Sequence, residues 1–151
     1  MPHSPAAALT QVALAIFRAN GRLLADGDAL VAPLALTSAR WQVLGAIALS
    51  VNPLSAPQIA AAMGITRQGA QKQLNLLLQD GLLEVRPNPH HARSPLYALS
   101  PRGSETYAAA EAIWMIRAAE LAQGLPPEDL AAARRVLEAI AGRLEPSGAH
   151  A

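Results

Sequence analysis

The sequence predicts a mainly α-helical protein that carries one short two-stranded β hairpin. Apolar residues make up 52% of the 151 residues and aromatic residues only 3%. Most of the apolar residues are alanine and leucine, which favours helix over sheet. Apolar side chains recur at helical spacing toward both ends of the chain. Two short β-forming runs, LLEVR and PLYAL, flank the turn-forming segment PNPHHARS, which predicts the hairpin.

The first helix is predicted over residues 5–30, where apolar side chains follow Leu9 at helical spacing. Gly21 and Gly27 weaken this helix, because glycine is a poor helix former. We therefore expect a bend or a break at one of them. Pro33 predicts a loop after the helix.

The second and third helices are separated by the dipeptide Asn-Pro at 52–53, which should end the second helix. Thr37 or Ser38 provides its N-cap. The third helix begins with Ser55 and Gln58, which have the spacing of a capping box. The Ser55 hydroxyl and the Gln58 amide can then each accept a hydrogen bond from one backbone N–H group at the helix start.

A fourth helix follows the third almost at once. Gly64 suits the left-handed position that ends the third helix, and Thr66 is the expected N-cap of the fourth. Asp80-Gly81 should end it. The hairpin comes next, Ser100-Pro101 opens a fifth helix that runs to about Gln123, and a sixth helix follows the segment GLPPED.

This order of elements is that of a winged helix-turn-helix with added helices at both ends. We expect the chain to divide into an N-terminal dimerisation helix and loop (1–35), a winged helix-turn-helix core (36–103) and C-terminal dimerisation helices (104–151). The terminal helices carry more apolar surface than the core can cover. Burial across a two-fold axis solves this problem, which predicts a homodimer.

The fourth helix has an unusual polar face. Helical steps of 100° place Gln68, Lys72 and Asn75 opposite the apolar side, with Gln71 on the shoulder and Arg67 nearer the buried edge. No acidic residue occurs from Ala29 to Gln79. A solvated helix normally mixes glutamate with lysine, so an acid-free face of amides and cations indicates a negatively charged partner.

The distribution of charge supports the same interpretation. The net charge of the whole chain is only +1, but residues 64–103 hold five basic and two acidic residues, giving +3. Residues 104–151 hold four arginines and seven acids, giving −3. A basic centre can present a local positive surface without a high overall charge.

The second helix of a helix-turn-helix lies in the major groove of DNA. Glutamine and asparagine pair with adenine there, and arginine and lysine pair with guanine. Arg93 at the predicted wing tip should reach the adjacent minor groove or its phosphates. The predicted DNA-binding residues are Ser55, Thr66, Arg67, Gln68, Gln71, Lys72, Asn75, Arg86, His91 and Arg93.

Several classes of protein are excluded or disfavoured by the sequence. Without cysteine there is no disulfide or thiolate metal site. The adjacent His90 and His91 have no nearby carboxylate, so no metal or other cofactor is expected. No catalytic motif or phosphate-binding glycine loop is present, which argues against an enzyme. No apolar stretch is long enough to span a membrane and no secretory signal is recognised, so a cytoplasmic location is expected.

Residues 36–103 also resemble a known family. The segments LTSARWQVL, LSAPQIAAAMGITRQGAQKQLNLLLQDGLL and ARSPLYALSPRG are together similar to the MarR (multiple antibiotic resistance regulator) family of transcription factors. The resemblance implies a homodimer that binds a pseudo-palindromic operator, most often as a repressor, and that a small organic ligand often releases. In the family, the wing usually carries an acid two places before its arginine, where this chain has His91.

The resemblance also implies an effector cleft between the dimerisation helices and the winged core. Candidate residues for a small aromatic or phenolic ligand there are Arg18, Arg22, Arg40, Trp41 and Tyr107. An alternative remains open at this point, namely a winged helix used only for protein–protein contact or dimerisation. That alternative predicts acids or a large apolar patch over residues 67–75, and the sequence has neither.

Overall fold

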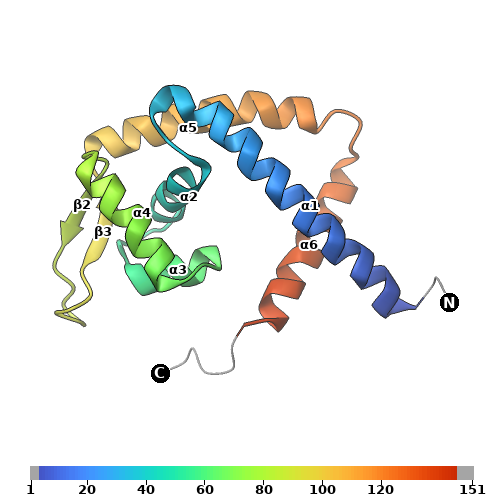
Figure 1. Cartoon of the computed structure of the whole chain (residues 1–151), viewed down its shortest axis with the longest axis horizontal. Helices are drawn as coiled ribbons and strands as arrows, with labels where there is room; N and C mark the ends of the chain where they lie inside the picture. Colours follow the sequence, from blue (N-terminus) through green and yellow to red (C-terminus); the bar gives the residue numbers. More distant parts are fainter. Residues whose placement is uncertain (1–3, 146–151) are drawn as a thin grey trace. The chain divides into compact units, whose positions relative to one another are not determined.

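Residues 4–145 are described by a computed structural model, in which six α-helices accompany a small antiparallel sheet (Figure 1). The chain divides into two compact units, with the boundary between Met115 and Ile116. The first unit contains helices α1 to α4, the whole sheet and most of helix α5. The second contains the end of α5 and helix α6.

Helix α1 runs without interruption from Pro5 to Val31, so of the predicted bend or break at Gly21 or Gly27 the break does not occur. Its N-cap is Ser4, whose hydroxyl accepts a hydrogen bond from the backbone N–H of Ala7. A single glycine costs a helix only about 1 kcal/mol relative to alanine. In addition, Gly27 is buried, and a Cβ at this position would overlap the Ser38 hydroxyl. Gly27 is therefore a close-packing position and not a helix breaker.

The corner between α1 and α2 is anchored by two side chains. The predicted loop contains a 3₁₀ turn, η1 (Ala32–Leu34), followed by Ala35 in the left-handed conformation. The Ser38 hydroxyl donates to the carbonyl oxygen of Leu24 at 2.7 Å, and the Ser38 N–H donates to the Asp28 carboxylate at 2.7 Å. These bonds hold the end of α1 against the start of α2 (Ser38–Ala48).

Helix α2 has Thr37 as its N-cap and ends at Ala48, before the predicted stop at residues 52–53. The chain must extend by then, because Leu54 and Ser55 form a short strand, β1. This strand pairs with β3 (Leu96–Leu99) and was not predicted. Two residues are too few to show a pattern in the sequence.

The predicted helix-turn-helix is confirmed residue by residue. Helix α3 (Ala56–Met63) starts with the capping box of Ser55 and Gln58, and Gly64 ends it in the left-handed conformation with φ of 64°. Thr66 is the N-cap of α4 (Arg67–Gln79), and its hydroxyl accepts from the Gly69 N–H at 3.0 Å. The turn between these helices is therefore fixed by local chemistry.

The predicted hairpin forms strands β2 (Leu83–Arg86) and β3. The sheet order is β1-β3-β2, with every pair antiparallel. Strand β3 starts one residue later than predicted, after Pro95, which has no N–H to give to the ladder. Apolar side chains from the helices and the sheet form one core, and its largest fully buried members are Leu44, Ile59, Leu74, Leu77, Val31 and Val43.

Helix α5 (Pro101–Leu121) begins with a tightly packed turn. Ser100 caps it, since its hydroxyl accepts from the Gly103 N–H at 2.9 Å and donates to the Gly81 carbonyl at 2.6 Å. Gly103 is buried against the backbone of Leu82, and a Cβ there would overlap the Leu82 carbonyl oxygen. The end of α4, the start of β2 and the start of α5 thus meet at one point.

The second unit consists of the end of α5 and helix α6 (Pro127–Arg143), joined by a turn in which Gly124 has φ of 77°. Glu128 and Asp129 lie in the first turn of α6 and Arg143 in the last, which suits the helix dipole. Over residues 4–145 no single helix is long and apolar enough to cross a membrane, although α1 with η1 passes that test jointly with α2 across an 81° bend.

Candidate nucleic-acid interface

The structure places most of the predicted readout residues on one exposed side of α4. Arg67, Gln68, Lys72 and Asn75 are exposed, and Gln71 is half-buried at their edge. We call these five residues the α4 face. The opposite side of the helix is fully buried through Ala70, Leu74 and Leu77. Arg67 is exposed, although the sequence placed it nearer the buried edge than the other polar side chains of this helix.

The N-terminal end of α4 favours an anion. The free N–H groups of the first turn carry partial positive charge, and no acid occurs in that turn. Thr66 is exposed beside it, although its hydroxyl already accepts from Gly69. Ser55 differs from the other candidates, since only 7% of it is exposed and it serves the capping box of α3. The structure therefore leaves Ser55 outside the exposed set.

Two amides of the α4 face are held by hydrogen bonds. The Gln71 side-chain nitrogen donates to the Asn75 side-chain oxygen at 2.9 Å and to the Tyr97 hydroxyl at 3.2 Å. Tyr97 belongs to β3 and is buried. Sequence reasoning did not find this contact, because Tyr97 lies 26 residues after Gln71.

The wing loop is closed by an asparagine and not by a pair between Arg93 and an acid. The Asn88 amide nitrogen donates to the Ser94 carbonyl at 2.9 Å, and its oxygen accepts from the His90 N–H at 3.0 Å. The second bond is an Asx turn, which the Asn-Pro dipeptide in PNPHHARS could have indicated. Arg93 and His91 are exposed in this loop.

Arg86 lies on the other arm of the wing, at the end of β2. Its side chain is 55% exposed and its guanidinium lies 3.8 Å from the Glu84 carboxylate. An exposed pair at this distance contributes little, so Arg86 stays available to another partner. The wing therefore presents the three exposed side chains that the sequence predicted for it.

The predicted effector residues differ in how far they are exposed. Arg18 and Arg22 are exposed on α1, whereas Arg40, Trp41 and Tyr107 are partly buried. Trp41 of α2 packs edge-on against Trp114 of α5, with ring centroids 6.0 Å apart. Burial, and then the Glu111 carboxylate, raise the pKa of Tyr107 above its usual value.

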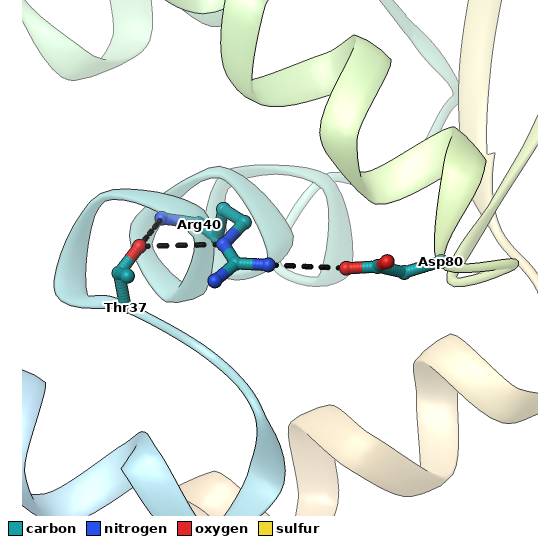
Figure 2. A network of polar contacts seen from close by, with 3 residues as sticks. All are labelled: Thr37, Arg40 and Asp80. Atoms are coloured by element: carbon teal, nitrogen blue, oxygen red, sulfur yellow. Dashed lines mark hydrogen bonds and ion pairs between the residues drawn. The ribbon is translucent and has the colours of Figure 1, made fainter.

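Arg40 has an internal role that the sequence did not reveal. Its guanidinium forms an ion pair with the Asp80 carboxylate at 3.0 Å and also bonds the Thr37 hydroxyl at 3.4 Å (Figure 2). Asp80 is the C-cap of α4, where a negative charge is unfavourable beside the helix dipole. Arg40 offsets that charge and joins α2 to the end of α4.

An exposed cationic and amide-bearing second helix, a tight turn and a basic wing define a winged helix-turn-helix of the DNA-binding class. Residues 36–94 match the family model described as the MarR family. The crystal structure of the MarR family transcription regulator SP03579 is 30% identical, with a TM-score of 0.74 and coverage of 87% of each chain. The chain belongs to the MarR family of transcription regulators, whose members are not enzymes.

Two further relatives extend the comparison. An uncharacterised protein of Mycobacterium tuberculosis is 36% identical over 119 residues, which is 79% of this chain and 82% of that protein. The crystal structure of CouR from Rhodococcus jostii RHA1, bound to p-coumaroyl-CoA, has a TM-score of 0.78 at 21% identity. The aligned region covers 86% of this chain and 91% of the CouR chain. The likeness to CouR shows a shared fold.

Proposed function

We propose that this regulator works as a homodimeric repressor that binds a pseudo-palindromic operator through the α4 face and the wing. The observation that carries the proposal is the α4 face itself, which is exposed at four of its five residues, is free of acids and starts at the positive end of a helix. The face offers amides and cations for base edges. Arg86 and Arg93 of the wing offer charge for phosphates. Such a protein works in the cytoplasm, where the chromosome is.

The homodimer is supported by apolar side chains that each unit leaves exposed. On α1, Phe17 is 74% exposed and Leu23 is 51% exposed. In the second unit, Ile116 and Leu144 are 69% and 76% exposed. Large apolar patches on a chain this small usually mark an interface. The terminal segments, 1–35 and 104–151, are therefore proposed as the dimerisation parts, and the two-fold axis would match half-sites about one helical turn apart.

An effector is proposed near α2 and the first half of α5. Trp41 and Trp114 supply aromatic surface, and Tyr107 packs 3.5 Å from the position of a Cβ at Gly45. Arg40 would attract a carboxylate, in competition with Asp80. A small aromatic or phenolic acid fits this set. The test is a panel of aryl carboxylates and phenols, read as loss of operator binding.

The proposal as a whole is tested by fluorescence anisotropy with DNA from upstream of the protein's own reading frame, at two salt concentrations. We expect specific binding that weakens steeply with salt, by a particle whose mass in light scattering is that of two chains. Lys72→Ala should weaken binding and change the preference at one base. Arg102→Ala removes the same charge from the same unit, outside the α4 face and the wing, and is the matched control.

Two results would count against the proposal. If no duplex is bound more tightly than random DNA, the winged helix serves another purpose, such as protein–protein contact. If Lys72→Ala and Arg102→Ala weaken binding equally, general charge explains the binding and the α4 face does not read sequence.

A further inference from the structure

Tyr97 connects the sheet to the α4 face. It lies in β3, the middle strand, where it is paired with Leu54 of β1 on one side and Val85 of β2 on the other. Only 3% of the residue is exposed, so packing fixes the ring and its hydroxyl. That hydroxyl accepts a hydrogen bond from the Gln71 amide at 3.2 Å. The position of Gln71 is therefore set by the sheet as well as by its own helix.

The hydrogen bonds of Gln71 use all of its donors. A glutamine amide has two N–H protons and one carbonyl oxygen. One proton goes to the Tyr97 hydroxyl and the other to the Asn75 side-chain oxygen at 2.9 Å. Gln71 is left with its Oε1 acceptor, and Asn75 with the two protons of its Nδ2. A free glutamine would pair with adenine through both its donor and its acceptor, but this one has no donor to spare.

We infer that Tyr97 is a specificity-determining positioning residue, which holds Gln71 as a pure hydrogen-bond acceptor toward DNA. The inference rests on the proposed DNA-binding function. An acceptor at this point selects a base whose major-groove edge carries an amino group, which means adenine (N6) or cytosine (N4). Thymine and guanine present carbonyl acceptors there. An acceptor facing an acceptor leaves both groups desolvated and unpaired.

The experiment begins with an operator selected from random duplexes by the wild-type protein. The operator position that residue 71 contacts is identified as the one at which the Gln71→Ala variant no longer prefers one base over the others. Gln79→Ala is the matched control, because it is the same substitution on the exposed C-terminal end of α4. Dissociation constants are then measured for the four bases at that position, with wild type, Tyr97→Phe, Gln71→Ala and the double variant.

We expect the wild type to prefer adenine or cytosine. Tyr97→Phe keeps the buried ring but frees the Gln71 amide to rotate, so the preference should fall roughly 2- to 10-fold, the net value of one hydrogen bond. In the Gln71→Ala background the same substitution should change nothing further. A change of equal size in both backgrounds would show that Tyr97 acts on the fold in general, and the inference would be wrong.

A second variant tests the acceptor role without touching Tyr97. The carboxylate of Gln71→Glu has acceptors only and can accept a hydrogen bond from the Tyr97 hydroxyl. It should bind all DNA less tightly, because a carboxylate is repelled by phosphates, yet still prefer adenine or cytosine. A shift to guanine or thymine would overturn the inference even if Tyr97→Phe were unstable.

The two levels of the proposal fail in different ways. A wild-type protein that enriches no duplex would refute the proposed function, and this inference with it. A wild type that binds specifically, with a Tyr97→Phe variant that keeps the full base preference, would refute the inference alone.

Discussion

Gly103→Ala should destabilise the protein, although alanine is a better helix former than glycine. The new Cβ would overlap the Leu82 carbonyl oxygen and lie 2.9 Å from the Leu82 carbonyl carbon. Both atoms belong to the backbone, so no side-chain rotation relieves the overlap. The same carbonyl accepts the Ser100 N–H at 3.1 Å. The start of α5 and the Leu82 backbone must therefore move apart, or the hydrogen bond from Ser100 must lengthen.

The magnitude follows from three contributions. Overpacking a tight site typically costs about 1–3 kcal/mol. Weakening one buried hydrogen bond adds about 1 kcal/mol, and the higher helix propensity of alanine offsets about 1 kcal/mol. The free energy of unfolding should thus fall by about 2 kcal/mol. For a chain of this size that lowers Tm by about 4–8 °C.

The assay is thermal unfolding followed by circular dichroism, with all variants at one protomer concentration because the proposed dimer makes Tm depend on it. Gly21→Ala is the matched control, because it is the same substitution in a helix interior. Apart from its own helix backbone and chain neighbours, no atom of residues 4–145 lies within 4 Å of the new Cβ. Gly21→Ala should raise stability by up to about 1 kcal/mol. If Gly103→Ala is as stable as the wild type, the close packing of α5 on Leu82 is wrong.

Three other substitutions test separate features. Arg93→Ala should weaken binding to all sequences about equally and lower the slope of log affinity against log salt by about 1, if the wing touches one phosphate through this side chain; an unchanged slope would refute the contact. Ser100→Ala removes the cap of α5 and leaves the Gly81 carbonyl without its donor, so urea unfolding should show a loss of about 1–2 kcal/mol. The raised pKa of Tyr107 means that the folded state holds this proton more tightly than the unfolded state. Its contribution to stability is present below about pH 10, the ordinary value for tyrosine, and is lost as the pH rises through the folded-state pKa. Tyr107→Phe should flatten the fall of unfolding free energy above pH 10, and an unaltered pH profile would contradict this.

The parts of the fold that sequence predicted well are those fixed by neighbouring residues. The Ser55–Gln58 capping box, Gly64 and the Thr66 cap act over three or four residues, so their spacing alone located α3, the turn and α4. The exposed side of α4 followed from helical spacing in the same way. The exposure of Arg67 did not follow from the sequence, because helical spacing gives only the direction of a side chain around the helix.

The parts that sequence missed depend on contacts between distant segments. Strand β1 exists only because β3 pairs with it. The role of Gly27 as a close-packing position depends on Ser38, which lies 11 residues later in the chain. The hydrogen bond between Gln71 and Tyr97 joins a helix to a strand 26 residues later. The sequence of neither segment indicates this contact. The candidate site was therefore predicted as a list of side chains, without the bonds that orient them.

The edge-on pair of Trp41 and Trp114 has a consequence for how this protein can be observed. These are both of the chain's tryptophans, and they meet at one contact between α2 and α5. The tryptophan emission of the chain therefore comes from a single contact in the first unit. A change in the tryptophan emission spectrum on adding DNA or a small molecule would therefore report on the contact between α2 and α5. No label is needed, and no other tryptophan contributes.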